Sequence, residues 1–465
     1  GGAGGETITG GAGNDSIVGA AGNDNISGGA GNDTFNFGTA GDLNNGDTVD
    51  GGDGTDKVLI VSSANLDSSV TASTSTTLTS IETVDIHSTA DGKSFDATNW
   101  ASLTTLIVGT GTDTHTMDVN NLPDGVTVQI DDANLDNSTF DVQAGADITI
   151  DLEATTATGL TITDAVNVTV TASDGAGDAT ALALDATDTK TLTLTGGDGV
   201  ALDVGNITNT DEITTITATT STASGTILTG TVADVDGLTS LNLTAVNANI
   251  TTGQIGTDAT ANNAELLANI TTVATGTSVV LTTGAIYADS TVDSTSDLAM
   301  TLDITTNAGA RNNIGAIDNT YGSITGTFKS HSTNDTDIGN LTAVAMTLNV
   351  SGEGDTDFQD LIGSGAVAVT ATGSGNVTID DANVDGTSAS FSVDASAMSG
   401  TIHVKGGNTS VASTITGGSG ADTLVGGSVA DTITGGAGAD KITTNAGNDT
   451  VTAGDGADAI TAGAG

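Results

Sequence analysis

The sequence predicts an all-β protein folded as a parallel solenoid of the β-roll or β-helix type. Three observations lead to this prediction: a nine-residue unit repeats near both ends of the 465 residues, short β-branched runs alternate with turn residues between them, and Pro, Trp and Tyr are nearly absent. We expect a repeat array over 1–60, a Thr- and Val-rich solenoid-like region over 61–410, and a second array over 411–465. The sequence opens and closes inside a repeat, so we expect it to be part of a longer chain.

The nonapeptide repeat is the strongest signal. The chain begins GGAGGETIT, GGAGNDSIV, GAAGNDNIS and GGAGNDTFN, and a fifth unit, GGDGTDKVL, starts at Gly51. From Gly417 it reads GGSGADTLV, GGSVADTIT, GGAGADKIT, TNAGNDTVT and AGDGADAIT. One such unit arises easily in a Gly-rich chain. Register kept over several units in two separate places indicates stacked repeats.

Each position of the unit has a physical role. Gly at the first, second and fourth positions permits positive φ and close backbone approach, which a tight turn requires. The apolar residue at position eight is flanked by polar strand formers, so we expect it to point inward and form the core. These predicted core residues are Ile17, Ile26, Phe35, Leu424, Ile433, Ile442, Val451 and Ile460.

The acidic residue at position six is the candidate metal ligand. Calcium takes six to eight oxygen ligands, which a carboxylate and turn carbonyls can supply together, so stacked turns would share ions. The primary candidates are Asp15, Asp24, Asp33, Asp56, Asp422, Asp431, Asp440, Asp449 and Asp458, and the secondary ones in the arrays are Glu6, Asp53 and Asp455. The alternative is that these acids are solvated turn residues, but aligned carboxylates would then repel one another.

This pattern resembles the RTX nonapeptide G-G-x-G-x-D-x-U-x, a calcium-binding β-helix repeat. The resemblance implies several bound Ca²⁺ ions, held between stacked turns.

Composition limits the partners. The chain has 58 acidic and seven basic residues, a formal net charge of −51, which excludes nucleic acid as a partner and destabilises a compact state unless cations neutralise it. It has no Cys, which excludes disulfides and thiolate zinc sites. We find no leader peptide and no apolar run long enough for a transmembrane segment in this sequence, so we expect any targeting signals to lie outside it.

The long middle region has the pattern of short strands of period two. The clearest are 126–130, 148–152, 166–170, 192–194 and 241–243, and their spacing suits either a solenoid or sandwich hairpins. We favour the solenoid because arrays flank it. We expect one or two helical turns over 264–270, and a core of aliphatic residues with no room for aromatic rings.

The middle region also offers secondary metal ligands. They lie in the segment SGEGDTDFQD and in two echoing segments that begin at Ile130 and Ile379. These candidates are Glu353, Asp355, Asp357, Asp131, Asp132, Asp380 and Asp381. Solvated loop carboxylates are the simpler interpretation in a chain this acidic.

No motif for catalysis stands out. The four His residues lie far apart, without a metalloprotease motif or a nucleophile elbow. Paired carboxylates of the glycosidase kind remain open among 58 acids, but the aromatic platforms that usually accompany them are lacking. We therefore predict that the chain is not an enzyme.

Beyond the arrays, the strand phrases Ser80–Ile86, Leu103–Val108 and Val393–Ile402 are similar to those of the RTX-type surface-layer (S-layer) proteins of alphaproteobacteria. The resemblance implies a secreted, cell-surface protein that self-assembles into a two-dimensional lattice with calcium. It also implies type I secretion and anchoring to lipopolysaccharide through a domain absent here. A calcium-rigidified RTX adhesin or biofilm matrix segment is the alternative, and a secreted RTX hydrolase is a third interpretation.

Overall fold

The chain folds into two compact units, which are described separately. In the computed structural model, unit 1 comprises 1–213 and 224–229, and unit 2 comprises 214–223 and 230–465. The structure describes residues 2–38, 43, 46–61, 77–87, 93–109, 116–131, 135–153, 158–172, 184–186, 188–196, 201–208, 212–220, 225–233, 237–256, 267, 269–287, 299–331, 335–386, 389–406 and 410–465.

Unit 1 consists of short strands joined by turns. They are β1 (Thr7–Ala12), β2 (Ser16–Ile17), β3 (Asn25–Ala30), β4 (Thr34–Phe37), β5 (Thr48–Asp53), β6 (Lys57–Ile60), β7 (Thr77–Thr79), β8 (Thr83–His87), β9 (Lys93–Asp96), β10 (Thr105–Gly109), β11 (Met117–Leu122), β12 (Val126–Ile130), β13 (Asp136–Leu152), β14 (Thr158–Ala172), β15 (Leu184–Ala186), β16 (Thr191–Thr195), β17 (Leu202–Val204), β18 (Ile207–Thr208) and β20 (Ile227–Thr229).

Unit 2 has the same construction. Its strands are β19 (Thr215–Thr219), β21 (Ser240–Val246), β22 (Ile250–Thr252), β23 (Asn269–Thr275), β24 (Val279–Thr282), β25 (Ile286–Tyr287), β26 (Ala299–Thr306), β27 (Ala310–Ile314), β28 (Ile317–Ser330), β29 (Thr336–Ile338), β30 (Leu341–Gly352), β31 (Thr356–Gly363), β32 (Ala366–Gly373), β33 (Val377–Val384), β34 (Ser390–Met398), β35 (Ile402–Lys405), β36 (Ser413–Thr416), β37 (Thr423–Val425), β38 (Thr432–Ala437), β39 (Lys441–Asn445), β40 (Thr450–Asp455) and β41 (Ala459–Ala462).

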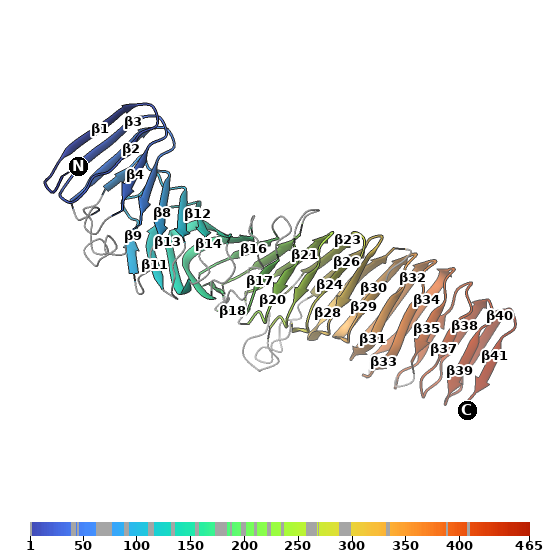
Figure 1. The fold of residues 1–465 in the computed structure, drawn as a ribbon. Helices are drawn as coiled ribbons and strands as arrows, with labels where there is room; N and C mark the ends of the chain where they lie inside the picture. Colours follow the sequence, from blue (N-terminus) through green and yellow to red (C-terminus); the bar gives the residue numbers. More distant parts are fainter. Residues whose placement is uncertain are drawn as a thin grey trace. The chain divides into compact units, whose positions relative to one another are not determined.

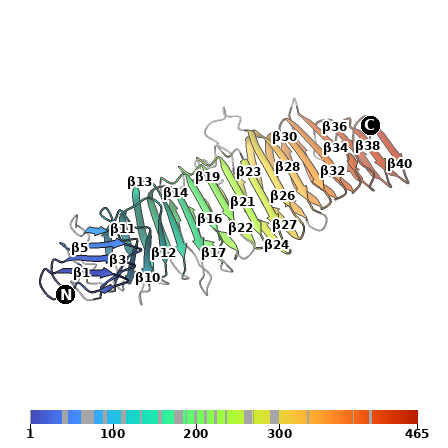
Figure 2. The same cartoon turned by 90° about the horizontal axis from the view of Figure 1, so that it is seen from above.

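Strand pairing within each unit is parallel, and each turn lies in register on the next. In unit 1, for example, β1 pairs with β3 and β3 with β5, while β10 pairs with both β8 and β12. Both views show successive strands of a unit lying side by side (Figures 1 and 2). Sandwich hairpins would require antiparallel pairs. The predicted parallel β-solenoid is therefore confirmed, and the sandwich alternative is not.

The described parallel strands of unit 2 form three sheets, and we call the outward side of the first of them face A. Face A is carried by β27, β29, the start of β31, the start of β33, β35, β37 and β39, which pair in that order. A second sheet pairs β25 with the starts of β28 and β30 and the ends of β31 and β33. A third runs from β26 through the end of β28 to β30, β32 and β34.

The core follows the period-two pattern of the strands. In β12, Val126, Val128 and Ile130 are fully buried, while Thr127 and Gln129 between them face outward and are half-buried. The other predicted strands of the middle region also fall within strands of the structure, in β13, β14, β16 and β21. For the expected helix over 264–270, residues 264–266 and 268 lie outside the described residues, and Asn269 and Ile270 begin β23 instead.

The position-eight residues of the arrays form the core there, with two exceptions. Ile17, Ile26, Phe35, Leu424, Ile433 and Ile442 are buried, as predicted. Val451 is half-buried, and Ile460 is 52% exposed. They lie on β40 and β41, the last two strands in this sequence.

The expectation that aromatic rings have no place in the core is wrong. All seven Phe residues of the chain are fully buried, and Trp100 is 3% exposed. Phe328 and Phe358 pack edge to face, with ring centroids 5.0 Å apart. Aliphatic residues fill most turns, and at Phe328 the ring lies in the space that Gly326, two residues earlier on β28, leaves open.

Candidate metal centres in the repeat arrays

The acids of the first array form two columns that cross the stacked turns. Column 1 consists of Glu6, Asp24 and Asp47, and column 2 of Asp15, Asp33, Asp56 and Glu82. Within a column, the backbone N–H of each acid donates to a carboxylate oxygen of the next acid, at 2.7 to 2.8 Å. One oxygen of each accepting carboxylate thus ties two turns together.

The second carboxylate oxygen in these columns is the chemically distinctive feature. Asp33 and Asp56 are 1% and 0% exposed, and Asp24 is 2% exposed. The second oxygens are buried without a hydrogen-bond donor among the described residues, for Glu6, Asp15, Asp24, Asp33 and Asp56 alike. An unpaired buried carboxylate oxygen is costly unless a cation meets it.

Backbone carbonyl oxygens face the same places. A Cβ atom on Gly10 would lie 2.5 Å from Asp15 Oδ2 and 2.5 Å from the carbonyl oxygen of Gly28 on the next turn. Around Gly28, the oxygens are Asp33 Oδ2 and the carbonyl of Gly51. The first glycine of these units therefore leaves a space in which a carboxylate oxygen and a carbonyl oxygen of two turns converge.

The second array repeats the arrangement. Asp422, Asp440 and Asp458 form one column, linked by N–H donation from each acid to the next at 2.9 and 3.0 Å. Asp431 and Asp449 form the other, linked at 2.9 Å. The second oxygen of Asp440 is buried and has no donor in the described part of the chain, whereas Asp422 Oδ2 accepts the Gly418 N–H and Asp431 Oδ2 the Gly427 N–H.

Burial raises the pKa of two of these acids, Asp56 and Asp422. Desolvation raises the pKa of Asp56 above its ordinary value, against the lowering effect of the N–H of Asp33, and the charges of Asp33 and Glu82 raise it further. Desolvation also raises the pKa of Asp422, and the charge of Asp440 adds to it. The carboxylates of a column therefore repel one another in the absence of a cation.

Two members of the columns, Asp47 and Glu82, were not predicted from the sequence. Asp47 is fully buried, and both residues accept the N–H of the preceding acid in their column. They lie outside any intact nonapeptide, because residues are inserted between the turns. The signal that could have revealed them is the triplet acid–Thr–apolar, which Asp47 and Glu82 begin just as Asp33 does.

The secondary candidates lie elsewhere. Asp53 and Asp455 are exposed, and their backbone carbonyls accept N–H groups of the neighbouring turn. Glu353 and Asp380 are exposed, Asp131, Asp355, Asp357 and Asp381 are half-buried, and Asp132 lies outside the described residues. Among the residues that the structure describes, no three acidic or His side chains gather tightly enough to hold a metal by themselves.

The comparisons identify the repeat. The model of the RTX calcium-binding nonapeptide repeat (4 copies) matches residues 1–35, 412–433 and 434–465. Both ends of the chain therefore carry RTX-type calcium-binding repeats. The matches cover nearly all of the first four N-terminal units and the whole second array, and leave 36–411 unmatched. No curated protein matches the chain.

The residues of the arrays fit the calcium ions that RTX repeats bind. Calcium prefers oxygen ligands, both carboxylate and carbonyl. The columns present these two kinds of oxygen together, with a buried carboxylate oxygen that lacks a donor. Asp15, Asp33 and Asp56 would hold ions in the first array, and Asp440 in the second. A bound ion supplies the positive charge that cancels the repulsion along a column.

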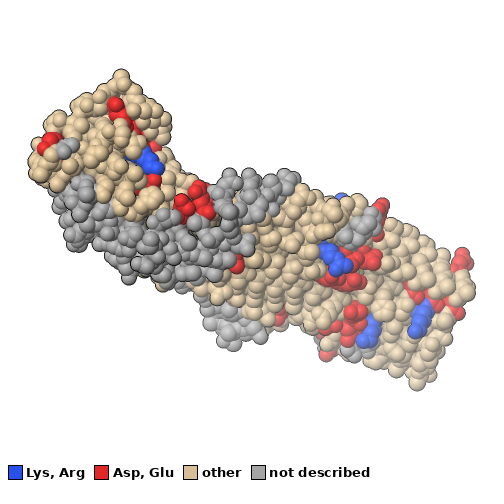
Figure 3. Space-filling model, viewed as in Figure 1, with Lys and Arg blue, Asp and Glu red and all other residues tan. Residues whose placement is uncertain are grey.

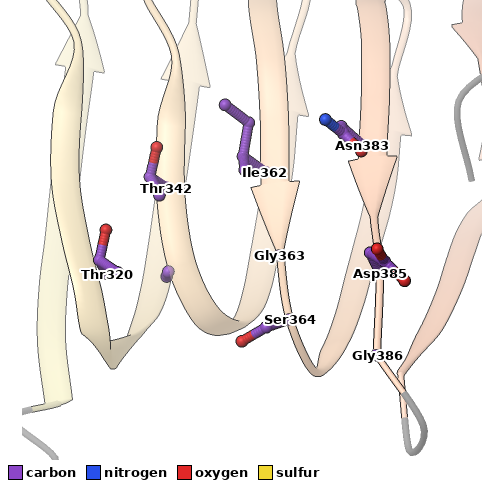
Figure 4. A pocket seen from close by; sticks show the side chains of 9 residues that line it. Thr320, Thr342, Ile362, Gly363, Ser364, Asn383, Asp385 and Gly386 are labelled. Carbon is purple, nitrogen blue, oxygen red and sulfur yellow. The ribbon is translucent and has the colours of Figure 1, made fainter.

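Two grooves of unit 2 that lie outside the arrays are lined by described residues. The larger, about 500 Å³, is lined by Thr320, Thr342, Ile362, Asn383, Asp385 and their neighbours, which stand side by side on successive strands (Figure 4). Asp385 is its one acid, and its carboxylate accepts a hydrogen bond from Ser410. The groove thus has no pair of carboxylates for glycoside hydrolysis.

Outside the arrays, His87 contacts a buried acid. His87 Nε2 lies 2.8 Å from Asp85 Oδ1, and Lys57 Nζ lies 2.5 Å from Asp85 Oδ2. Asp85 is 5% exposed on β8, between the apolar Leu59 of β6 and Ile107 of β10 in the register. The cluster neutralises a buried carboxylate. No helix in the described part of the chain is long and apolar enough to cross a membrane.

Proposed function

We propose that this RTX-type chain is the lattice-forming part of a structural surface-layer protein that folds and self-assembles outside the cell on binding calcium. The observation that carries the proposal is the set of carboxylate columns, in which buried oxygens of five first-array acids and of Asp440 lack a donor among the described residues, in a chain of net charge −51. RTX repeats in a β-solenoid fit a secreted RTX-family protein.

The ligand assignment is part of the proposal. The position-six acids Asp15, Asp24, Asp33, Asp56, Asp422, Asp431, Asp440, Asp449 and Asp458 bind the ions together with turn carbonyls, and Asp47 and Glu82 extend the columns of the first array. The division into arrays at 1–60 and 411–465 and a lattice region at 61–410 belongs to it as well. The 18-residue step between stacked acids in both arrays supports that division.

Folding and calcium binding are linked in this scheme. In Asp33 and Asp56, one oxygen accepts an N–H of the preceding turn while the other is buried without a donor among the described residues, so the folded arrays are costly without cations. Extracellular calcium modules bind with dissociation constants of about 10⁻⁴ to 10⁻³ M. The chain would then stay unfolded where calcium is scarce and fold after export, as the type I secretion implied by the family resemblance requires.

Surface placement follows from the same resemblance, as does an alphaproteobacterial source. Anchoring to lipopolysaccharide would fall to a domain outside this sequence. A calcium-rigidified adhesin or biofilm matrix segment uses the same repeats and is the competing proposal. It differs in one respect, because it needs no contact between copies of the chain.

The test is a calcium titration of the purified chain, followed by far-UV circular dichroism and negative-stain electron microscopy, with matched samples in chelator. We expect β structure to appear only with calcium, and ordered sheets or tubes to form. Full β structure in chelator would refute calcium-linked folding. Calcium-dependent folding into isolated particles at all concentrations would replace the lattice by the adhesin.

A further inference from the structure

Face A of unit 2 concentrates the few cations of the unit. Unit 2 has four Lys and Arg residues, Arg311, Lys329, Lys405 and Lys441. Three of them project from strands of face A, since β27 begins with Ala310 and Arg311, β35 ends with Lys405 and β39 begins with Lys441. Lys329 lies on β28, in another sheet. Three of the four basic residues of unit 2 thus lie on one sheet of a very acidic chain, which suggests that face A has a role of its own.

The first half of face A is acidic. Asp337 on β29 is in register with Asp357 on β31. On the next turn, Asp380 lies on β33 two residues beyond Thr378, the register partner of Asp357. All three line a groove of about 340 Å³. Desolvation raises the pKa of Asp337 and of Asp357, and neighbouring acids raise both further. Arg311 pairs with Asp335, at 2.5 Å, and leaves these three carboxylates without a salt bridge in the described part of the chain.

The second half of face A is basic. His403, Lys405 and Lys441 are exposed on β35 and β39, and no acid projects from β35, β37 or β39. Neither lysine forms an ion pair with any described residue. Figure 3 shows basic side chains lying beside acidic ones on the visible side of unit 2.

The order of these charges is self-complementary. Consider a second copy laid on face A by a two-fold axis parallel to the strands, between β33 and β35. Such an axis reverses the order of the turns and keeps the position along each strand, so that β33 faces β35, β31 faces β37 and β29 faces β39. Asp380 then faces Lys405, and Asp337 faces Lys441. The register places Asp337 and Lys441 at the same position along their strands.

We propose that face A is an isologous interface between two copies of this chain, held by Asp380–Lys405 and Asp337–Lys441 pairs, each formed twice. The inference rests on the proposed function, for which it supplies one lattice contact. Asp357 faces the neutral Thr423 in this arrangement, and Thr378 faces His403, so no like charges meet among these residues.

The size of the contact suits a lattice. Six turns at about 4.8 Å each and strands of about 16 Å give roughly 500 Å² per copy. A stable isolated dimer usually buries about 800 Å² per partner. The contact is therefore weak alone, depends on protein concentration and ionic strength, and becomes effective when each chain makes several contacts.

Charge reversal tests this interface. Lys405→Glu places one new acid against Asp380 of the other copy, twice per dimer, and the swap Asp380→Lys/Lys405→Glu restores both pairs in reversed order. Lys329→Glu is the matched control, with the same charge change on another sheet. Association is measured by sedimentation velocity in calcium over a range of concentrations, and folding by circular dichroism in the same buffers.

We expect Lys405→Glu to weaken association by roughly tenfold or more, the swap to restore it and the control to leave it unchanged. Association that is unaffected by Lys405→Glu, or is lost in the swap as much as in the single variant, would overturn the interface. If the wild type folds with calcium but stays monomeric, this interface fails and calcium-linked folding stands. If calcium does not induce folding, the proposed function fails instead.

Discussion

Replacing Asp33 by Asn should have opposite effects with and without calcium. Asp33 is 1% exposed in the middle of column 2, where one oxygen accepts the N–H of Asp15 and the other lacks a donor. The amide oxygen of the substituted side chain would keep the bond to Asp15, and the substitution would remove a buried charge. In chelator, the variant should therefore be more stable than the wild type.

The magnitudes follow from the geometry. At a turn spacing of about 4.8 Å and an effective dielectric constant of about 20, two carboxylates repel by roughly 3 kcal/mol before screening, so relief of about 1 to 3 kcal/mol is expected. With calcium, one site filled at 100 times its dissociation constant contributes about 2.7 kcal/mol. Because Asp33 lies between two other acids of its column, its loss should remove about 3 to 5 kcal/mol of calcium-dependent stability.

The assay is far-UV circular dichroism: urea unfolding in saturating calcium, and the residual β signal in chelator, where a more stable variant should retain more β structure than the wild type. The matched control is Asp303→Asn, which removes the same charge from an exposed position on β26 and should change little in either condition. If Asp33→Asn lowered stability equally with and without calcium, Asp33 would act only as a turn cap, and the metal assignment of column 2 would be wrong.

Three further predictions test the same arrays. Gly10→Ala should reduce calcium binding, because its Cβ would fill the space that Asp15 Oδ2 and the Gly28 carbonyl face. Calcium binding is measured by isothermal titration calorimetry. The control is Gly125→Ala, which lies outside the arrays and whose Cβ would meet no atom within 4 Å, so it reports the general cost of replacing a glycine. Asp47→Asn should lower calcium-dependent stability by about 2 to 3 kcal/mol, although Asp47 is outside an intact repeat, and an unchanged calcium midpoint in circular dichroism would exclude it from the column. In chelator, the residual β signal in circular dichroism should increase as the pH falls towards the folded pKa of Asp56. Desolvation raises that pKa above its ordinary value of 3.8, and the stability tied to the proton is lost as the pH rises through the folded pKa. In saturating calcium the trend should reverse, since protons compete for the ligands.

The sequence predicted the solenoid because its signals are local. An inward residue at position eight, a Gly turn and period-two strands fix each turn, and parallel stacking follows when every turn buries the same face. The burial of Ile26 and Ile433 was therefore predictable. The burial of every Phe was not, because room for a ring depends on the side chains around it, as at Phe328, whose ring lies over Gly326 of the same strand.

The site was predictable only as far as the nonapeptide stays intact. Asp15 and Asp33 were found by register, whereas Asp47 and Glu82 are brought into the columns by turns of 23 and 26 residues. The sequence alone does not tell how many inserted residues a turn can accommodate while its strands stay in register. Face A could not be predicted from the sequence for the same reason. Asp380 and Lys405 are far apart in the chain, and only the register places them on adjacent turns.

The two oxygens of each column acid explain why calcium, and not merely high salt, should order the arrays. The first oxygen caps a backbone N–H of the adjacent turn and is committed in the folded state. In Asp15, Asp33, Asp56 and Asp440, the second oxygen is buried without a donor among the described residues and lies near a carbonyl of the next turn, a space too enclosed for a diffuse ion atmosphere. A dehydrated cation with oxygen ligands meets both requirements. Sodium chloride should therefore weaken the contacts across face A and leave the arrays folded, while chelator should unfold the arrays at any concentration of sodium chloride.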